Sequence, residues 1–316
     1  MQEFFVMLKS VIIFVLLAVP GYIAVKTKLF KSEDSNVLSK LALYVAVPFF
    51  IVSSTVSMDL TGKMAINLLL VACFYSIFMV LAIFIAKLFI KKDNEKGLSG
   101  LERFCVIFAN NGFIGLPLAE AVFGSNSPIL AYIIVINVIN VTMLMVLGSY
   151  MFSGDKSSIS FKGIVKSPAI IAFVIAIIIN LIGVKEVSSE VIYYSNYIKS
   201  LVTPISMTIL GMKFADVKIS SLFTSKRLYY ISFLKLVVVP AIVIAIMLVI
   251  NIFVAIDNGI IFTMFIGFAT STASLTTSLA DRYKVGEQEA SIYVLGTTLF
   301  SVITLPILYA LLCLMI

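Results

Sequence analysis

The chain has 316 residues, of which 61% are hydrophobic and only 12% are charged, and its mean hydropathy is +1.14. A soluble globular domain carries roughly 25% charged residues, so this composition excludes one. The net charge is +7, but the cations fall between apolar runs and form no basic tract, so we predict no nucleic-acid partner. No histidine is present, which excludes His-dependent metal sites and catalytic triads.

Apolar runs spread over the whole length predict an all-α, polytopic membrane protein in the lipid bilayer. The first run lacks a cleavage site and is expected to be a retained span rather than a signal peptide. In chain order, the ten predicted transmembrane helices cover residues 5–25, 36–57, 64–90, 101–123, 127–152, 164–184, 191–213, 226–253, 258–281 and 288–315.

The distribution of cations predicts the orientation of these spans. With the N-terminus outside, 18 of the 23 Lys and Arg residues lie on inner connections or inner span ends. Four lie at outer ends, and Lys235 lies inside a span. This asymmetry is a strong positive-inside signal. We therefore predict a multi-pass protein of the plasma membrane of a bacterial cell, with both termini outside.

The fourth span contains the most informative motif of the chain. Its segment Asn110–Pro117 reads NNGFIGLP, and it holds two carboxamides, two glycines and one proline at mid-membrane depth. These residues predict a broken helix, since proline lacks the backbone donor and clashes with the preceding turn. Broken backbone inside a membrane is tolerated only where protein or a water-filled cavity covers it. Such breaks are typical of the solute site of transporters.

Ten spans divide into two sets of five, and the odd number makes the second set inverted relative to the first. The repeats are predicted to cover residues 1–153 and 154–316. The repeat mate of span 4 is then span 9, which has seven hydroxyl side chains between Thr270 and Ser278 but no proline. These hydroxyls either form a second break that binds a ligand, or bond back to the carbonyls of their own helix.

A break exposes backbone N–H groups where its second half begins, and the helix dipole adds positive charge there. We expect these starts near Gly115–Pro117 in span 4 and Ser271–Ser274 in span 9. Asn137 and Asn140 share one face of span 5 and either face the break or join neighbouring helices. The predicted substrate-binding residues are Asn110, Asn111, Gly112, Gly115, Pro117, Asn137, Asn140, Thr270, Ser271, Thr272 and Ser274.

Two ionisable residues inside the spans are candidate charge partners. Lys235 either attracts an anionic substrate, pairs with Glu120, or extends to the inner interface. No pair of aspartates occurs at mid-membrane, which argues against an ion-exchange site. No cofactor and no further metal site is predicted. A coupling ion stays open: sodium near Thr270 and Ser271, a proton carried by Glu120 or the substrate, or none.

The motif Asn110-x-Gly112-Phe113-x-Gly115-x-Pro117 resembles that of the auxin efflux carrier family, which includes plant auxin exporters and bacterial dicarboxylate carriers. Lesser matches are Pro48, Pro204, Gly211, Lys235, Pro240, Ala280-x-Arg282-Tyr283 and Thr304-Leu305-Pro306. The resemblance covers essentially the whole chain. It implies two inverted five-helix repeats in which helices 4 and 9 are broken and cross. It also implies an elevator-type transporter with a scaffold of spans 1, 2, 6 and 7, a transport domain of spans 3–5 and 8–10, and a homodimer formed through span 2 and its mate.

One residue departs from the family pattern. Ser271 stands where the family usually has a proline in span 9, so the second break is expected to be milder or to be formed by the Ser and Thr cluster.

These features predict a secondary active or facilitative transporter of a small organic anion, auxin-like or dicarboxylate. The alternatives are a sodium- or proton-coupled symporter of another amphipathic solute and, less favoured, a channel or receptor. A membrane enzyme is not expected, because the chain has no HExxH, GxSxG or intramembrane Asp pair.

Overall fold

The computed structural model describes residues 2–56, 61–91, 97–155, 166–182, 189–217 and 219–316. Within these ranges the chain is all-helical, and its one β-type contact is an isolated antiparallel bridge. The predicted all-α class is therefore confirmed. The span ends predicted at residues 57, 164–165 and 183–184 lie outside the described residues.

The helices follow the predicted apolar runs closely. The first half consists of α1 (Gln2–Lys26), η1 (Ser32–Asp34), α2 (Ser35–Leu41), η2 (Ala42–Ala46), α3 (Val47–Val56), α4 (Gly62–Phe89), α5 (Leu98–Ile107), η3 (Asn111–Gly115), α6 (Leu116–Phe123), α7 (Pro128–Met143), η4 (Leu144–Gly148) and α8 (Ser149–Ser153). The second half consists of α10 (Pro168–Leu181), α11 (Ser189–Ser200), α12 (Val202–Asp216), α13 (Ile219–Thr224), α14 (Lys226–Phe233), η6 (Leu234–Val238), α15 (Val239–Phe253), α16 (Asn258–Ala269), α17 (Leu275–Tyr283) and α18 (Glu287–Met315).

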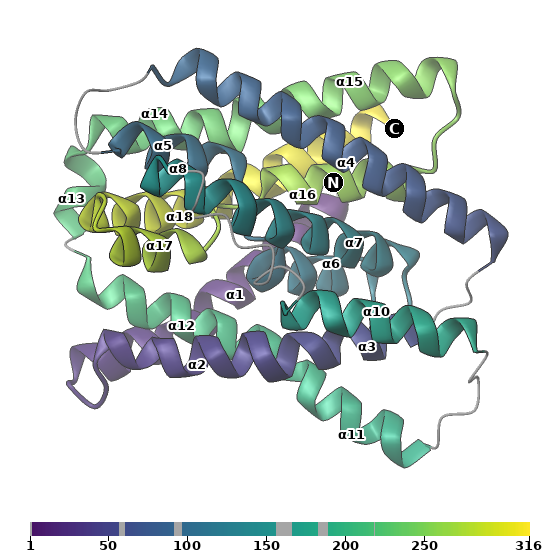
Figure 1. The fold of residues 1–316 in the computed structure, drawn as a ribbon, viewed down its shortest axis with the longest axis horizontal. Helices are drawn as coiled ribbons and strands as arrows, with labels where there is room; N and C mark the ends of the chain where they lie inside the picture. The colour runs from purple at the N-terminus through teal and green to yellow at the C-terminus, as the bar shows by residue number, and fades with distance from the viewer. Residues whose placement is uncertain (1, 57–60, 92–96, 156–165, 183–188, 218) are drawn as a thin grey trace.

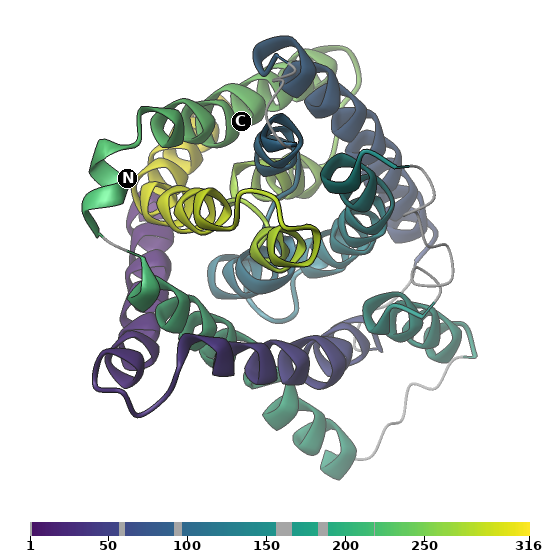
Figure 2. The ribbon, with the colours of Figure 1, turned by 60° about the vertical axis from the view of Figure 1, so that its left-hand side comes forward.

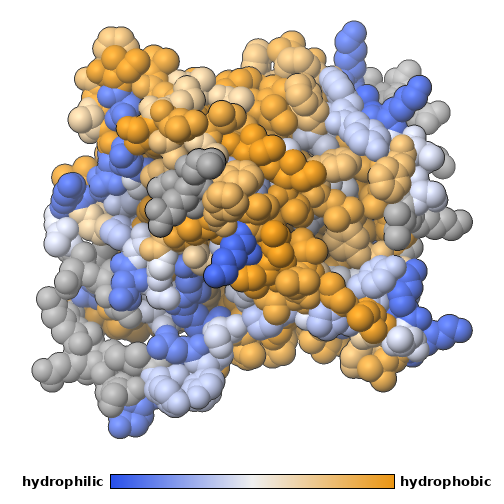
Figure 3. All heavy atoms as spheres, turned by 180° about the vertical axis from the view of Figure 1, so that it is seen from behind, coloured by the Kyte–Doolittle hydropathy of each residue, from blue (hydrophilic) through white to orange (hydrophobic). Residues whose placement is uncertain are grey.

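Six described segments are long and apolar enough to cross a membrane, and three further apolar helices are shorter. The six are Phe4–Lys26, Ser32–Val56, Gly62–Phe89, Pro128–Ser153, Lys226–Phe253 and Glu287–Met315. Figure 3 shows hydrophobic side chains over the middle of one face and most hydrophilic ones toward its two edges. The chain is therefore a polytopic membrane protein, while the count of ten spans stays a prediction.

Wide π-helical turns precede three of the prolines inside the helices. Proline cannot donate a backbone hydrogen bond and clashes with the carbonyl of the preceding turn. A π-helical turn widens the helix locally, so it accommodates the proline without ending the span. The turns are η2, η3 and η6, which end two residues before Pro48, Pro117 and Pro240, respectively.

The helices form two sides with the broken spans between them. In Figures 1 and 2, α2, α3, α10, α11 and α12 lie along one side, and α4, α14 and α15 lie along the opposite side. Helix α1 packs tightly on α12, and the close approach requires glycine at the contact. A Cβ atom at Gly211 would overlap the carbonyl of Ala18, and one at Gly21 would overlap that of Thr208. On the other side, α16 packs against α4, α7 and α15.

Candidate functional site

Spans 4 and 9 are both interrupted, and the two interruptions pair with each other. Helix α5 ends at Ile107 and the span resumes with η3, while α16 ends at Ala269 and α17 begins at Leu275. The amide of Asn110 donates to the carbonyl of Ser271 at 2.9 Å, and the amide of Ala273 donates to the carbonyl of Phe108 at 3.0 Å. This antiparallel contact satisfies backbone groups that the breaks expose. The second break therefore forms without a proline.

The second half of span 4 begins earlier than predicted. Helical backbone resumes at Asn111 rather than near Gly115–Pro117, because Pro117 lies in the first turn of α6 and is accommodated by η3. Asn110, the residue just before η3, has φ −83° and ψ 55°. The N–H groups at the start of this half thus belong to Asn111 and the residues after it. In span 9 the start lies at Ser274–Leu275, as predicted.

A buried chain of hydrogen bonds joins the two breaks to spans 3 and 5. The hydroxyl of Thr270 donates to Asn111 Oδ1 at 3.3 Å, and Asn111 Nδ2 donates to the hydroxyl of Tyr75 at 3.0 Å. Tyr75 then donates to Asn140 Oδ1 at 3.1 Å, and Asn140 Nδ2 donates to the carbonyl of Ala109 at 2.9 Å. Each side chain in this series has a hydrogen-bond partner, and these bonds fix the geometry of the break.

Tyr75 is the one side chain in this series of hydrogen bonds that the sequence did not predict. It lies in the middle of α4, it is fully buried, and its ring packs against Phe268. A buried tyrosine hydroxyl usually has a hydrogen-bond partner. This rule predicts that a buried Tyr75 has a hydrogen-bond partner, but it does not identify the partner residue.

A cavity of about 260 Å³ lies beside the breaks. Asn110, Gly112, Asn137, Asn140 and Ser274 line it together with apolar residues of η2, α7, η4 and α10. None of its lining residues is charged. Five of the predicted residues therefore line a cavity whose polar side chains are carboxamides and the hydroxyls of Tyr44, Ser167 and Ser274.

Asn137 is the carboxamide most available to a ligand. It is 2% exposed, it lines the cavity, and its Oδ1 has no hydrogen-bond partner within the described structure. A Cβ atom at Gly112 would approach that oxygen to 3.3 Å, so glycine keeps the space open. Asn110, by contrast, donates from Nδ2 to Ser274 Oγ at 2.7 Å across the breaks.

Six predicted site residues do not line the cavity: Asn111, Gly115, Pro117, Thr270, Ser271 and Thr272. Several of them hold the frame. The hydroxyl of Thr272 donates to the carbonyl of Cys105 at 2.9 Å, and the hydroxyl of Thr298 donates to Ser271 Oγ at 3.1 Å. Further along, Thr276 and Thr277 bond back to carbonyls of their own segment. The hydroxyl cluster therefore both supports the second break and bonds back to helix carbonyls, at different positions, while ligand binding by it stays a prediction.

The two ionisable candidates do not meet. Glu120 instead forms an ion pair with Lys199 of α11, with 2.7 Å between Nζ and Oε1. Lys235 is fully buried, so the expectation that it extends to the inner interface is wrong. It lies on η6, which packs against α5, α16 and α18, and within the described residues its Nζ has no hydrogen-bond partner. Neither residue lines the cavity.

An all-helical chain with several spans, two of which are interrupted around a cavity inside the apolar core, has the architecture of a membrane transporter. The sequence model of a family described as "Membrane transport protein" matches residues 5–162 and 156–309. The chain belongs to this family, which confirms its recognition as a member of the auxin efflux carriers.

Two relatives are uncharacterized transporters of archaea. The one from Methanocaldococcus jannaschii is 29% identical over 213 residues, which cover 64% of this chain and 67% of that protein. The one from Methanothermobacter thermautotrophicus is 28% identical over 205 residues, which cover 64% of this chain and 65% of that protein. The matched region thus spans about two-thirds of each relative. These matches support a multi-pass membrane transporter and name no substrate.

We expect Ser271→Pro, which introduces the usual family residue, to be tolerated. Thr270 already has φ −66° and ψ 157°, the extended backbone that a following proline requires. Ser271 contacts Asn110 through its carbonyl, which proline retains. The variant should keep the thermal midpoint of the purified wild-type protein, whereas Thr263→Pro inside α16 should lower it strongly. Equal damage by both substitutions would contradict an open backbone at Ser271.

Proposed function

We propose that the chain is a secondary active or facilitative transporter of a small organic anion across the plasma membrane, by an elevator-type mechanism. The observation that carries the proposal is the uncharged cavity bounded by both breaks. A helix start and carboxamides hold a carboxylate by hydrogen bonds and by the helix dipole. No cation of the described ranges lines the cavity, so the empty site itself does not hold an unpaired charge inside the membrane.

The lining favours one class of anion. Most of the cavity wall consists of apolar residues such as Leu43, Val47, Phe113 and Leu144, and its polar side chains are few and uncharged. A dicarboxylate would place its second charge against apolar wall, which is costly inside a membrane. We therefore favour an amphipathic monocarboxylate, auxin-like in having an apolar body, over malate- or malonate-like substrates.

The elevator proposal uses the repeats at residues 1–153 and 154–316. Spans 3–5 and 8–10 would move as the transport domain against the scaffold of spans 1, 2, 6 and 7. The cavity is lined by Ser167–Ala169, at the predicted inner end of span 6. At the predicted outer end, the ion pair between Glu120 and Lys199 joins α6 to α11. If both termini lie outside, as predicted, these contacts support an inward-facing state.

Coupling to sodium or to a proton is the alternative to uncoupled transport. The hydroxyls of Thr270 and Ser271 already have protein partners, at Asn111 and Thr298 respectively, so a sodium ion there would have to replace those bonds. A proton could travel on the substrate carboxylate itself. We therefore favour uncoupled or proton-linked transport over sodium coupling at this position.

We also propose that the protein is a homodimer through spans 2 and 7. Large apolar or aromatic side chains are exposed there, among them Tyr44 on η2 and Tyr193 and Tyr197 on α11. Figure 2 shows α11 projecting from the edge of the molecule, beside α2 and α3.

Uptake into proteoliposomes tests the transport proposal. Indole-3-acetate and phenylacetate are compared with malate and malonate, each with and without sodium and with and without a pH gradient. We expect saturable uptake of the aromatic monocarboxylates, independent of sodium. Uptake of the dicarboxylates alone would overturn the substrate class, and uptake of no acid would overturn the anion proposal.

A further inference from the structure

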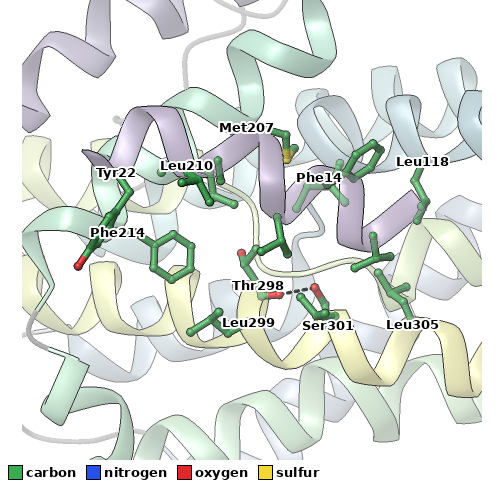
Figure 4. A pocket seen from close by; sticks show the side chains of 17 residues that line it. Phe14, Tyr22, Leu118, Met207, Leu210, Phe214, Thr298, Leu299, Ser301 and Leu305 are labelled. Atoms are coloured by element: carbon green, nitrogen blue, oxygen red, sulfur yellow. Dashed lines mark hydrogen bonds between the residues drawn. The ribbon is translucent and has the colours of Figure 1, made fainter. Parts of the chain in front are cut away.

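An apolar groove lies between α1 and α12 on one side and α18 on the other (Figure 4), and it shares no lining residue with the cavity. It has a volume of about 210 Å³. Its lining is apolar except for Tyr22 and the hydroxyls of Thr298 and Ser301. Both hydroxyls donate to protein acceptors: Thr298 to Ser271 and to Val294, and Ser301 to Thr298. The groove therefore fits an apolar ligand rather than a polar solute.

The groove extends beyond this first pocket. A second apolar pocket of about 230 Å³ shares Tyr22, Phe214 and Leu299 with it and continues toward α13. Val15, Val19 and Leu299 line the first pocket and are each about 40% exposed. In a membrane-spanning chain such an exposed apolar surface faces lipid. A smaller enclosed apolar cavity, of about 150 Å³, already binds a molecule of the size of benzene.

Cations mark the end of the groove that the predicted orientation places inside. The ammonium of Lys26, at the end of α1, lies 5.6 Å from the centre of the Tyr22 ring, and Lys26 is exposed. Lys28 and Lys31 follow in the turn to η1 and are exposed as well. Basic residues beside an apolar surface at the cytoplasmic interface attract anionic lipid headgroups.

We propose that this groove binds one acyl chain of an anionic phospholipid from the inner leaflet, with the phosphate at Lys26. The bilayer supplies such a chain at high concentration beside Val15 and Val19. The phosphate balances the charge of Lys26, which forms no ion pair with another residue of the described ranges.

The bound chain would contact both sides of the carrier. Phe14 and Met207 belong to α1 and α12, while Ile114 and Leu118 belong to η3 and α6 behind the first break. If the elevator proposal holds, the lipid lies where the transport domain moves past the scaffold and favours the state described here. The binding itself does not rest on the transport proposal and is measured without substrate.

The chain contains no tryptophan, so an introduced one reports on a single place. Val19→Trp puts the reporter at the mouth of the groove, about 10 Å along α1 from Lys26. Leu16→Trp is the matched control, because Leu16 lies on the same helix and is 61% exposed but does not line the groove. Each variant is reconstituted with phosphatidylcholine and phosphatidylglycerol, and one of the two lipids at a time carries brominated acyl chains.

We expect brominated phosphatidylglycerol to quench the Val19→Trp protein more than brominated phosphatidylcholine at equal mole fraction, and to quench the Leu16→Trp protein no more. Adding Lys26→Gln should lower the preference about fivefold, the factor that one cation at an anionic surface contributes. Lys40→Gln, an exposed inner lysine away from the groove, should leave it unchanged. Equal quenching by both lipids at Val19→Trp, or a preference that Lys26→Gln leaves unchanged, would overturn the proposal. Native mass spectrometry of the wild-type protein gives an independent reading: retained phosphatidylglycerol supports the site, and no retained lipid overturns it.

Discussion

Asn111→Ala is expected to abolish uptake while the protein remains inserted and folded. The side chain is fully buried, and its carboxamide joins Thr270 of one break to Tyr75 of span 3. Alanine leaves the Thr270 hydroxyl without its acceptor and leaves the Tyr75 hydroxyl with only its bond to Asn140, and a buried unpaired group costs about 1–3 kcal/mol. Because Asn111 does not line the cavity, the loss comes from misplacing Asn110 and Gly112, which do. A misplacement of about 1 Å can cost a hundredfold in rate.

The measurement is initial uptake of the substrate found in the acid screen, normalised to reconstituted protein. Asn126→Ala is the matched control, because Asn126 is an exposed residue of the connection after α6. Asn137→Ala provides a contrast: it removes a group that lines the cavity and should raise KM more than it lowers the maximal rate. Wild-type uptake by Asn111→Ala would contradict the assignment of the break to the transport site. The same expectation holds for Pro117→Ala, which relaxes the wide turn η3.

Local residue chemistry predicted the break in span 4 and gave a break in span 9 as one of two alternatives. Span 4 carries its own breakers in Asn110–Pro117, and span 9 carries hydroxyls that can replace helical hydrogen bonds. The absence of a proline at Ser271 did not prevent the second break, since Asn110 and Phe108 of the first break supply partners for its backbone. A broken segment paired with another broken segment needs no local signal of its own.

The partners of the buried polar residues could not be predicted from the sequence. Tyr75 and Asn140 are 65 positions apart, and Glu120 and Lys199 are joined by folding alone. Depth was also misjudged for Lys235: the position along the span suggested the inner interface, but its helix face turns toward α5 and α18. A sequence pattern predicts the position of a residue along a span and the period of the helix. The direction in which a helix face turns depends on the helices packed around it.

The inner half of span 4 is held by an ion pair between a buried carboxylate and a half-exposed arginine, which the sequence did not indicate. Glu102 of α5 is 3% exposed and accepts two hydrogen bonds from Arg227 of α14, at 2.6 and 2.5 Å. The hydroxyl of Tyr293 of α18 donates to the same carboxylate at 3.3 Å. Bidentate pairing of this kind fixes geometry as well as charge. It ties span 4 to spans 8 and 10, which are expected to move together.

Arg227→Leu should therefore destabilise the protein, because it leaves the buried carboxylate of Glu102 without its cation. The loss should fall below the value of about 3–5 kcal/mol for a fully buried pair, since the Arg227 side chain is 48% exposed. The double variant Glu102→Leu with Arg227→Leu should recover most of that loss, since an apolar pair leaves no uncompensated charge. Thermal unfolding in detergent measures both. The readout is labelling of the buried thiol of Cys105 by a fluorescent maleimide, in a background without the other two cysteines.

Arg282→Leu is the control for loss of a cation, because Arg282 is exposed on α17 and should leave the unfolding midpoint unchanged. If the double variant were as unstable as Arg227→Leu, the lost packing of the arginine stem would explain the effect and the charge argument would fail. If it recovers stability but loses uptake, the ion pair is needed to hold the inner half of span 4 in register with spans 8 and 10. That result would separate what stabilises the fold from what keeps the break aligned during transport.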